Sequence, residues 1–164
     1  MVAMARLKSD QLEPTIHKLS SIMKYMLYQT EEKVLLKSEI ELYRSAFQMV
    51  KDKKYDEAID SFNAFLYIFP KSKYAANAQY WLGESIYALD DYVNAMINFA
   101  KVVENYPNSS KIADAKLKIG YCYYSIKKWK EARFIFSNIM KDYPNTSLSQ
   151  LADKKIKSMN VEGR

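Results

Sequence analysis

Residues 76–107 read ANAQYWLGESIYALDDYVNAMINFAKVVENYP, and this stretch meets partial copies of itself 37 residues to either side. The shift aligns six columns of similar residues. They are Ala46, Gly83 and Gly120; Tyr55, Tyr92 and Trp129; Ala58, Ala95 and Ala132; Phe62, Phe99 and Phe136; Pro70, Pro107 and Pro144; and Ala78, Ala115 and Ala152. Because all six columns share one phase, the chain contains an internal repeat.

A repeat of about this length, with small and aromatic positions in alternation and a closing proline, is typical of tetratricopeptide repeats, which are helix pairs. We therefore predict an all-α fold: a superhelix of three helix pairs with a C-terminal capping helix, preceded by an N-terminal helix. The predicted repeats are 38–74, 75–111 and 112–147, and the cap is 148–158. Residues 1–37 are expected to form the N-terminal helix and a linker, and residues 159–164 a tail.

The repeat columns have a steric interpretation. Gly83 and Gly120 are expected where the two helices of a repeat approach most closely, with Ala95 and Ala132 facing them. The phenylalanine column is expected to fill the larger gaps between repeats. Three hydroxyl residues follow the repeat prolines by two positions, and each is a candidate helix N-cap: Ser72, Ser109 and Thr146.

Apolar residues in the N-terminal segment alternate three and four apart. They are Leu12, Ile16, Leu19, Met23 and Met26. The pattern covers only about two heptads, whereas a coiled coil is assigned from three or four. Two interpretations remain open: the remnant of an oligomerising coiled-coil stalk, or an amphipathic helix that packs on the first repeat.

The composition argues against an enzyme and against metal or cofactor binding. The chain has one histidine, His17, and one cysteine, Cys122. A Ser/His/Asp or Cys/His catalytic unit has no support in the sequence, and a zinc site of the usual ligand set is excluded. The sequence also has no glycine-rich phosphate loop. We therefore expect no catalytic residues, no metal and no cofactor.

The net charge of +6 is concentrated in the third repeat, where residues 111–147 hold eight basic and three acidic side chains. A solvated lysine-rich face explains this charge, since no nucleic-acid-binding motif accompanies it. No apolar run approaches the ~18 residues of a membrane helix. We expect neither nucleic acid binding nor membrane insertion.

The run Ala-Gln-Tyr-Trp-Leu-Gly-Glu at residues 78–84 resembles the C-terminal tetratricopeptide domain of the YbgF/CpoB family, the periplasmic coordinators of the Tol–Pal system. The Tyr-Pro-Asn joints at residues 106–108 and 143–145 fit as well, and the resemblance covers residues 39–157. It implies a non-enzymatic adaptor in the periplasm that trimerises through an N-terminal coiled coil. It also implies two partners, TolA and a bifunctional penicillin-binding protein, and a role in linking outer-membrane constriction to septal peptidoglycan synthesis.

The sequence departs from this family in two respects. It starts without a signal peptide, and its stalk is short. A complete chain of this kind would be cytoplasmic, and the alternative function is then a cytoplasmic scaffold or co-chaperone. The carboxylate clamp of co-chaperones needs lysine and asparagine on the first helices of the repeats. The clamp is absent here, because the matching positions hold Tyr43, Phe47, Tyr80, Glu84, Leu117 and Tyr121.

The first helices of the repeats are expected to line a concave groove that binds a segment of a protein partner. Counting from the glycine column gives the groove positions, most of which are aromatic or aliphatic, as suits an interface. They are Tyr43, Phe47 and Val50 with Ile40 in repeat one; Asn77, Tyr80, Glu84 and Tyr87 in repeat two; and Asp114, Leu117, Tyr121 and Tyr124 in repeat three.

Overall fold

The structure, a computed structural model, describes residues 19–20, 22–24, 26–27 and 38–164. The chain divides into two compact units, residues 1–41 and 42–164. This division falls within a helix and not at residues 37 and 38, where the sequence pattern suggested it. Residues 38–51 are continuously helical, so the boundary at residues 41 and 42 lies inside a described helical stretch.

The described part of the first unit is helical and exposes apolar side chains. Leu19, Met23 and Met26 are 55, 63 and 63% exposed, and Ile22 and Leu27 are exposed beside them. Leu12 and Ile16, the other two residues of the predicted seam, lie outside the described residues. The seam is therefore apolar and open to solvent where it can be seen, and its role in self-association stays a prediction.

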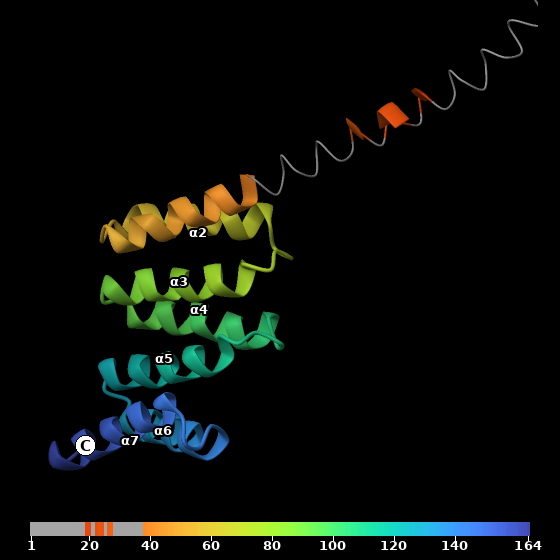
Figure 1. Ribbon diagram of the computed structural model, residues 1–164. Helices are drawn as coiled ribbons and strands as arrows, with labels where there is room; N and C mark the ends of the chain where they lie inside the picture. Colours follow the sequence, from red (N-terminus) through yellow and green to blue (C-terminus); the bar gives the residue numbers. More distant parts are fainter. Residues whose placement is uncertain (1–18, 21, 25, 28–37) are drawn as a thin grey trace, which may run out of the picture. The chain divides into compact units, whose positions relative to one another are not determined.

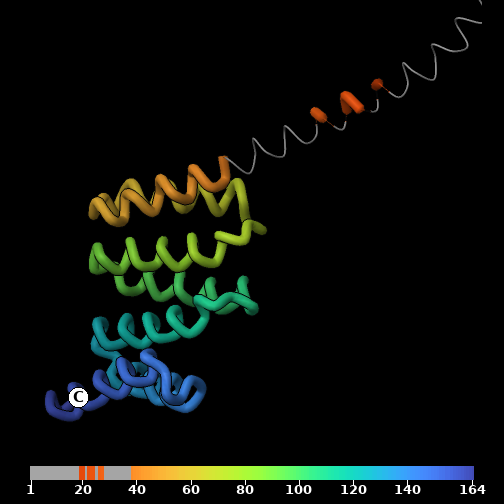
Figure 2. The backbone as a smooth tube through the Cα atoms, viewed as in Figure 1, coloured from red at the N-terminus to blue at the C-terminus, as the bar shows by residue number. Residues whose placement is uncertain are grey.

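The second unit is a stack of helices. Residues 42–51 are followed by α2 (Tyr55–Ile68), α3 (Ala75–Ala88), α4 (Tyr92–Asn105), α5 (Ile112–Ser125), α6 (Trp129–Asp142) and α7 (Ser147–Val161). Each of α2 to α7 packs on its neighbours in the chain, and α7 also contacts α5 (Figures 1 and 2). The described residues contain no strand. The predicted all-α repeat fold with a capping helix is confirmed.

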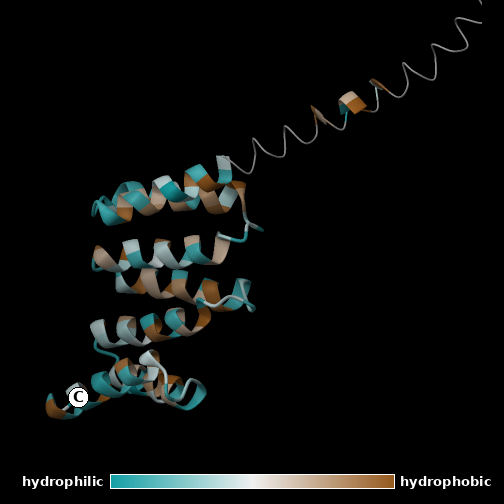
Figure 3. Ribbon diagram, viewed as in Figure 1, coloured by the Kyte–Doolittle hydropathy of each residue, from teal (hydrophilic) through white to brown (hydrophobic). Residues whose placement is uncertain are grey.

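Hydrophobic and hydrophilic residues share each helix (Figure 3), as expected when one side of a helix is buried in the stack. The predicted columns form the buried side: the alanines at 46, 58, 78, 95, 115, 132 and 152 and the phenylalanines at 62, 99 and 136 are all 0% exposed. Three clusters of buried residues follow one another along the unit. The core is thus distributed over the repeats.

The glycine column meets the phenylalanines of its own repeat, which corrects the expected arrangement. A Cβ added to Gly83 would lie 2.8 Å from Phe99, and one added to Gly120 would lie 2.7 Å from Phe136. The rings therefore occupy the space that the missing side chains leave within a repeat. Sequence spacing alone placed them between repeats because it could not show where a long side chain points.

The turns within the repeats also recur. Lys53, Asp90 and Lys127 lie 37 residues apart, and their φ angles are 59°, 62° and 62°. Few residues other than glycine adopt this left-handed conformation. Asp90 accepts a hydrogen bond from the Tyr92 hydroxyl, whereas the two lysines have no matching side-chain bond in the described part of the chain.

Helix ends were predicted with mixed success. Thr146 is the N-cap of α7 and accepts a hydrogen bond from the Ser149 backbone N–H at 3.2 Å. Ser72 and Ser109 are not N-caps, because they accept bonds from the backbone of residues 74 and 111 and close turns before α3 and α5. The capping helix does not end at 158 but continues to Val161, since Met159 is fully buried and anchors it.

Candidate partner-binding groove

The groove positions lie on residues 42–51, α3 and α5, and they differ in how far they are exposed. Tyr80 is 8% and Leu117 is 4% exposed, so these two side chains are buried in the core and do not present a free surface. The other positions from Tyr43 to Tyr124 are half-buried. Tyr80 is covered by contacts with its own repeat, since its ring packs 5.5 Å from that of Phe99.

An aromatic seam joins repeats one and two along the predicted groove. The Tyr43 ring stacks on Tyr74 with centroids 5.1 Å apart, and the Phe47 ring meets Trp81 edge-on at 4.9 Å. Both contacts connect a predicted groove residue to a residue that was not among the predicted groove positions. This junction is therefore apolar, and Tyr74 and Trp81 belong to its surface.

The seam between repeats two and three is charged at the corresponding positions. Glu84 takes the place of Phe47 and Lys118 the place of Trp81, and they form an ion pair at 2.8 Å. Lys111, in the position of Tyr74, lies 5.1 Å from the ring centroid of Tyr80. Burial raises the pKa of Tyr80, and the nearby carboxylates of Glu84 and Asp114 raise it further. The groove thus changes from aromatic to charged along its length.

A third row of contacts continues the pattern at Tyr87 and Tyr124. The Tyr87 hydroxyl lies 3.5 Å from the Ser125 hydroxyl, and the Lys118 ammonium lies 5.2 Å from the Tyr87 ring centroid. One repeat later, Tyr124 donates a hydrogen bond to Glu162 at 2.7 Å, and Lys155 lies over the Tyr124 ring. Tyr87 on α3 is therefore contacted by side chains of α5, and Tyr124 on α5 by Lys155 on α7 and by Glu162 directly after that helix.

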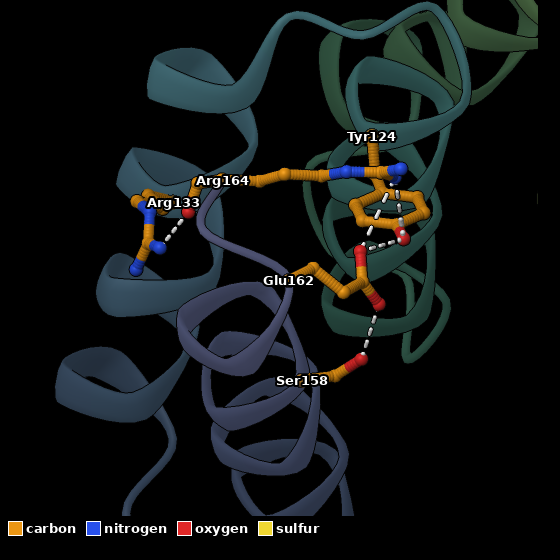
Figure 4. A network of polar contacts seen from close by, with 5 residues as sticks. All are labelled: Tyr124, Arg133, Ser158, Glu162 and Arg164. Atoms are coloured by element: carbon orange, nitrogen blue, oxygen red, sulfur yellow. Dashed lines mark hydrogen bonds and ion pairs between the residues drawn. The ribbon is translucent and has the colours of Figure 1, made fainter.

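The last of these contacts belongs to a polar network at the end of α7 (Figure 4). Glu162 also accepts a hydrogen bond from Ser158 at 2.8 Å, and Arg164 lies 3.2 Å from the Glu162 carboxylate. The hydrogen bond from Tyr124, followed by that from Ser158, lowers the pKa of Glu162. Arg133 donates a hydrogen bond to the Arg164 carbonyl. Residues 162–164 are thus part of the packed domain and not the free tail that the sequence suggested.

The described residues contain no cluster of three or more histidine, cysteine, aspartate or glutamate side chains that could hold a metal ion. Cys122 is fully buried, and burial raises the pKa of its thiol to about 12. Among the described helices, none is both long and apolar enough to cross a membrane. The predicted groove positions take part in ring packing, ion pairing and hydrogen bonding.

Comparisons with known proteins agree with this fold. A family profile described as "Outer membrane lipoprotein" (YfiO) matches residues 36–98, and a tetratricopeptide-repeat profile matches residues 114–146. Two curated proteins from Pseudomonas putida, both named "Cell division coordinator CpoB", are 57% identical to this chain over 42 residues. That stretch is 26% of this chain and 16% of the relatives, so the match spans about a sixth of their length.

Solved structures share the fold at low identity. The type III secretion chaperone SycD of Yersinia enterocolitica, in complex with a peptide of the translocator YopD, has a TM-score of 0.64 at 16% identity, over 76% of this chain and 93% of that one. The first tetratricopeptide domain of human RPAP3 gives 0.62 at 18% identity, with coverage of 76 and 93%. The Arabidopsis OM64 domain gives 0.61 at 16%, with coverage of 73 and 94%.

The helix stack, the repeat profile and the 57% identity over 42 residues point to one assignment. Together they identify residues 42–164 as a stack of tetratricopeptide repeats, in a chain that shares a 42-residue stretch of similarity with the CpoB cell division coordinators.

Proposed function

We propose that this chain is a non-enzymatic adaptor that binds a segment of a protein partner across α3 and α5. The observation that carries the proposal is the row of half-buried aromatic and polar side chains on these helices, and the 42-residue similarity to the CpoB cell division coordinators supports it. Tyrosine side chains offer a large contact area with a polar end, which suits protein interfaces. The peptide complex of SycD shows that a protein of this fold accommodates a segment of another protein.

The resemblance to the family supplies the finer proposal. The partners are TolA and a bifunctional penicillin-binding protein, the compartment is the periplasm, and the process is the coupling of outer-membrane constriction to septal peptidoglycan synthesis. The profile described as an outer membrane lipoprotein, matched by residues 36–98, supports a setting in the cell envelope.

The test is a titration of the full chain with purified TolA, followed by calorimetry. Asn77→Trp adds an indole to a half-buried groove position without removing packed atoms. We expect it to weaken binding at least tenfold, about 1.4 kcal/mol. Asn63→Trp on α2 is the matched control, because Asn63 is an exposed asparagine outside the groove.

The result that contradicts the proposal is an unchanged dissociation constant for Asn77→Trp in a variant whose thermal unfolding is normal. No binding of TolA to the wild-type chain would contradict the partner and leave the groove to be tested with the penicillin-binding protein.

We further propose that the N-terminal helix associates with copies of itself, as a trimer by resemblance to the family. The exposed apolar side chains of Leu19, Met23 and Met26 support this, because burying them on association removes apolar area from water. Sedimentation of the full chain should show a higher mass than that of the Leu19→Asp, Met23→Asp variant. Equal monomer masses would favour packing of this helix within one chain.

A further inference from the structure

A polar cavity opens beside the groove residue Asn77. Its volume is about 440 Å³, and it lies between the residues that begin α3 and the turn that joins α4 to α5. We call it the rim cavity. Among its lining residues are Lys73, Asn77, Asn105, Tyr106, Asn108 and Ser110.

The lining of the rim cavity is rich in hydrogen-bond donors and lacks negative charge. It includes one ammonium group, that of Lys73, three carboxamides and several hydroxyls, but no carboxylate. Lys73 is exposed and approaches the Tyr74 ring at 5.1 Å, and it forms no ion pair within the described part of the chain. The side-chain amides of Asn77, Asn105 and Asn108 likewise have no hydrogen-bond partner there.

The next repeat differs at both positions, because Ser110 stands in the column of Lys73 and an acid stands in the column of Asn77. Asp114 stands in the column of Asn77, and its carboxylate lies 3.6 Å from the ammonium of Lys111. The negative charge at that position is therefore supplied by the chain itself. In repeat two the corresponding residue is the neutral Asn77, and no carboxylate lines the cavity beside Lys73.

We propose that the rim cavity binds an aspartate or glutamate side chain of the partner segment that occupies the groove. A carboxylate only accepts hydrogen bonds, and the amide, hydroxyl and ammonium groups of the cavity can all donate them. Bonds between a carboxylate and an ammonium are charge-assisted and stronger than neutral ones. A basic side chain would meet Lys73 and be repelled. This inference rests on the proposed function, because it names the chemistry of one residue of the groove-bound segment.

The test uses two short probes in place of a natural partner. The full chain is titrated with N-acetyl-Ala-Glu-Ala-amide and with N-acetyl-Ala-Gln-Ala-amide at constant salt. The side-chain NH₂ resonances of Asn77, Asn105 and Asn108 are followed by NMR. We expect these signals to shift and saturate with the glutamate peptide, with at least fivefold higher affinity than with the isosteric glutamine peptide.

Variants locate the charge that makes the difference. Lys73→Gln should remove the preference for the glutamate peptide. Lys71→Gln should keep it, because Lys71 is also an exposed lysine but does not line the cavity. The inference is overturned by equal affinities for the two peptides, by an absence of binding, or by shifts that fall on the basic third repeat instead.

The two proposals fail separately in these experiments. If TolA binds and Asn77→Trp blocks it while the peptides show no preference, the groove stands and the acidic residue is wrong. If the glutamate preference is present and TolA does not bind, the cavity stands and the partner is wrong.

Discussion

The Lys118 ammonium on α5 donates a hydrogen bond to the Glu84 carboxylate on α3 at 2.8 Å, at the positions where Trp81 meets Phe47 one repeat earlier. The ammonium and carboxylate side chains are 26 and 20% exposed, so water screens the pair only in part. The second carboxylate oxygen of Glu84 is buried without a partner in the described structure. Lys118 is therefore the only described partner of a mostly buried charge.

We expect Lys118→Met to destabilise the domain by about 1–3 kcal/mol, the cost of leaving a polar group buried without its partner. Removing both charges with Glu84→Met and Lys118→Met should restore most of the loss, because replacement of a buried pair by apolar groups is often neutral. Urea unfolding measures both variants. As a control, Lys157→Met breaks the exposed pair with Asp153 and should cost less than about 1 kcal/mol. Equal costs for the two lysine variants would contradict this account.

Gly83 should not tolerate a side chain. Gly83→Ala would gain up to about 1 kcal/mol in helix propensity, but its Cβ would lie 2.8 Å from the fully buried ring of Phe99. Overpacking of a core costs about 1–3 kcal/mol, so we expect net destabilisation in chemical denaturation. Phe99→Leu should reduce the cost of the alanine, since it removes the clashing ring atoms. If the alanine costs as much beside leucine as beside phenylalanine, the clash is not the cause.

Cys122 is expected to be unreactive in the folded protein. Its pKa of about 12 leaves a thiolate fraction on the order of 10⁻⁴ at pH 8, and its side chain is fully buried. A chromogenic disulfide should therefore react only as fast as the domain unfolds, and at full speed in urea. Because the chain has one cysteine, the absorbance reports this site alone. Rapid labelling of the native chain would show that the buried cluster that holds Cys122 with Ala95 and Phe99 opens without global unfolding.

Glu162 should titrate below the ordinary carboxyl range of roughly 4.3, because the Tyr124 and Ser158 hydroxyls donate to it. With the pKa lowered in the folded state, its contribution to stability is present above that range and is lost as the pH falls through the folded value. Tyr124→Phe should move the Glu162 titration, followed by NMR, back toward the ordinary pKa. Ser149→Ala is a control at the other end of α7. No movement in the phenylalanine variant would mean that the hydroxyl of Tyr124 is not the cause.

The repeat columns allowed much of the fold to be predicted, because alanine, glycine, phenylalanine and proline recur at positions that packing restricts. The first of these prolines, Pro70, follows the end of α2 at Ile68 by two residues. Ser72 and Ser109 were misassigned because a hydroxyl two residues before the cap can satisfy a turn instead. Local sequence does not distinguish the two uses.

The groove was harder to predict from the sequence. Counting along a helix gives the residues on one face but not how deeply each is covered, so Tyr80 and Leu117 were grouped with half-buried neighbours. The seam partners Trp81 and Lys118 were missed because they join residues 34 apart whose identities change from repeat to repeat. The repeat register aligns them, but only the three-dimensional stack shows that they contact each other across repeats.

The left-handed backbone conformation of Lys53, Asp90 and Lys127 lowers the stability of the domain. A non-glycine residue in this conformation costs of order 1 kcal/mol, and Lys53 and Lys127 bear this cost without a side-chain bond in the described structure to offset it. Glycine at both sites should raise the melting temperature, and the two gains should add because the turns are far apart in the chain. At Asp90 the same change would lose the bond from Tyr92 and gain less. The domain could thus be made more heat-resistant at two turns while the predicted groove positions on α3 and α5 stay unaltered.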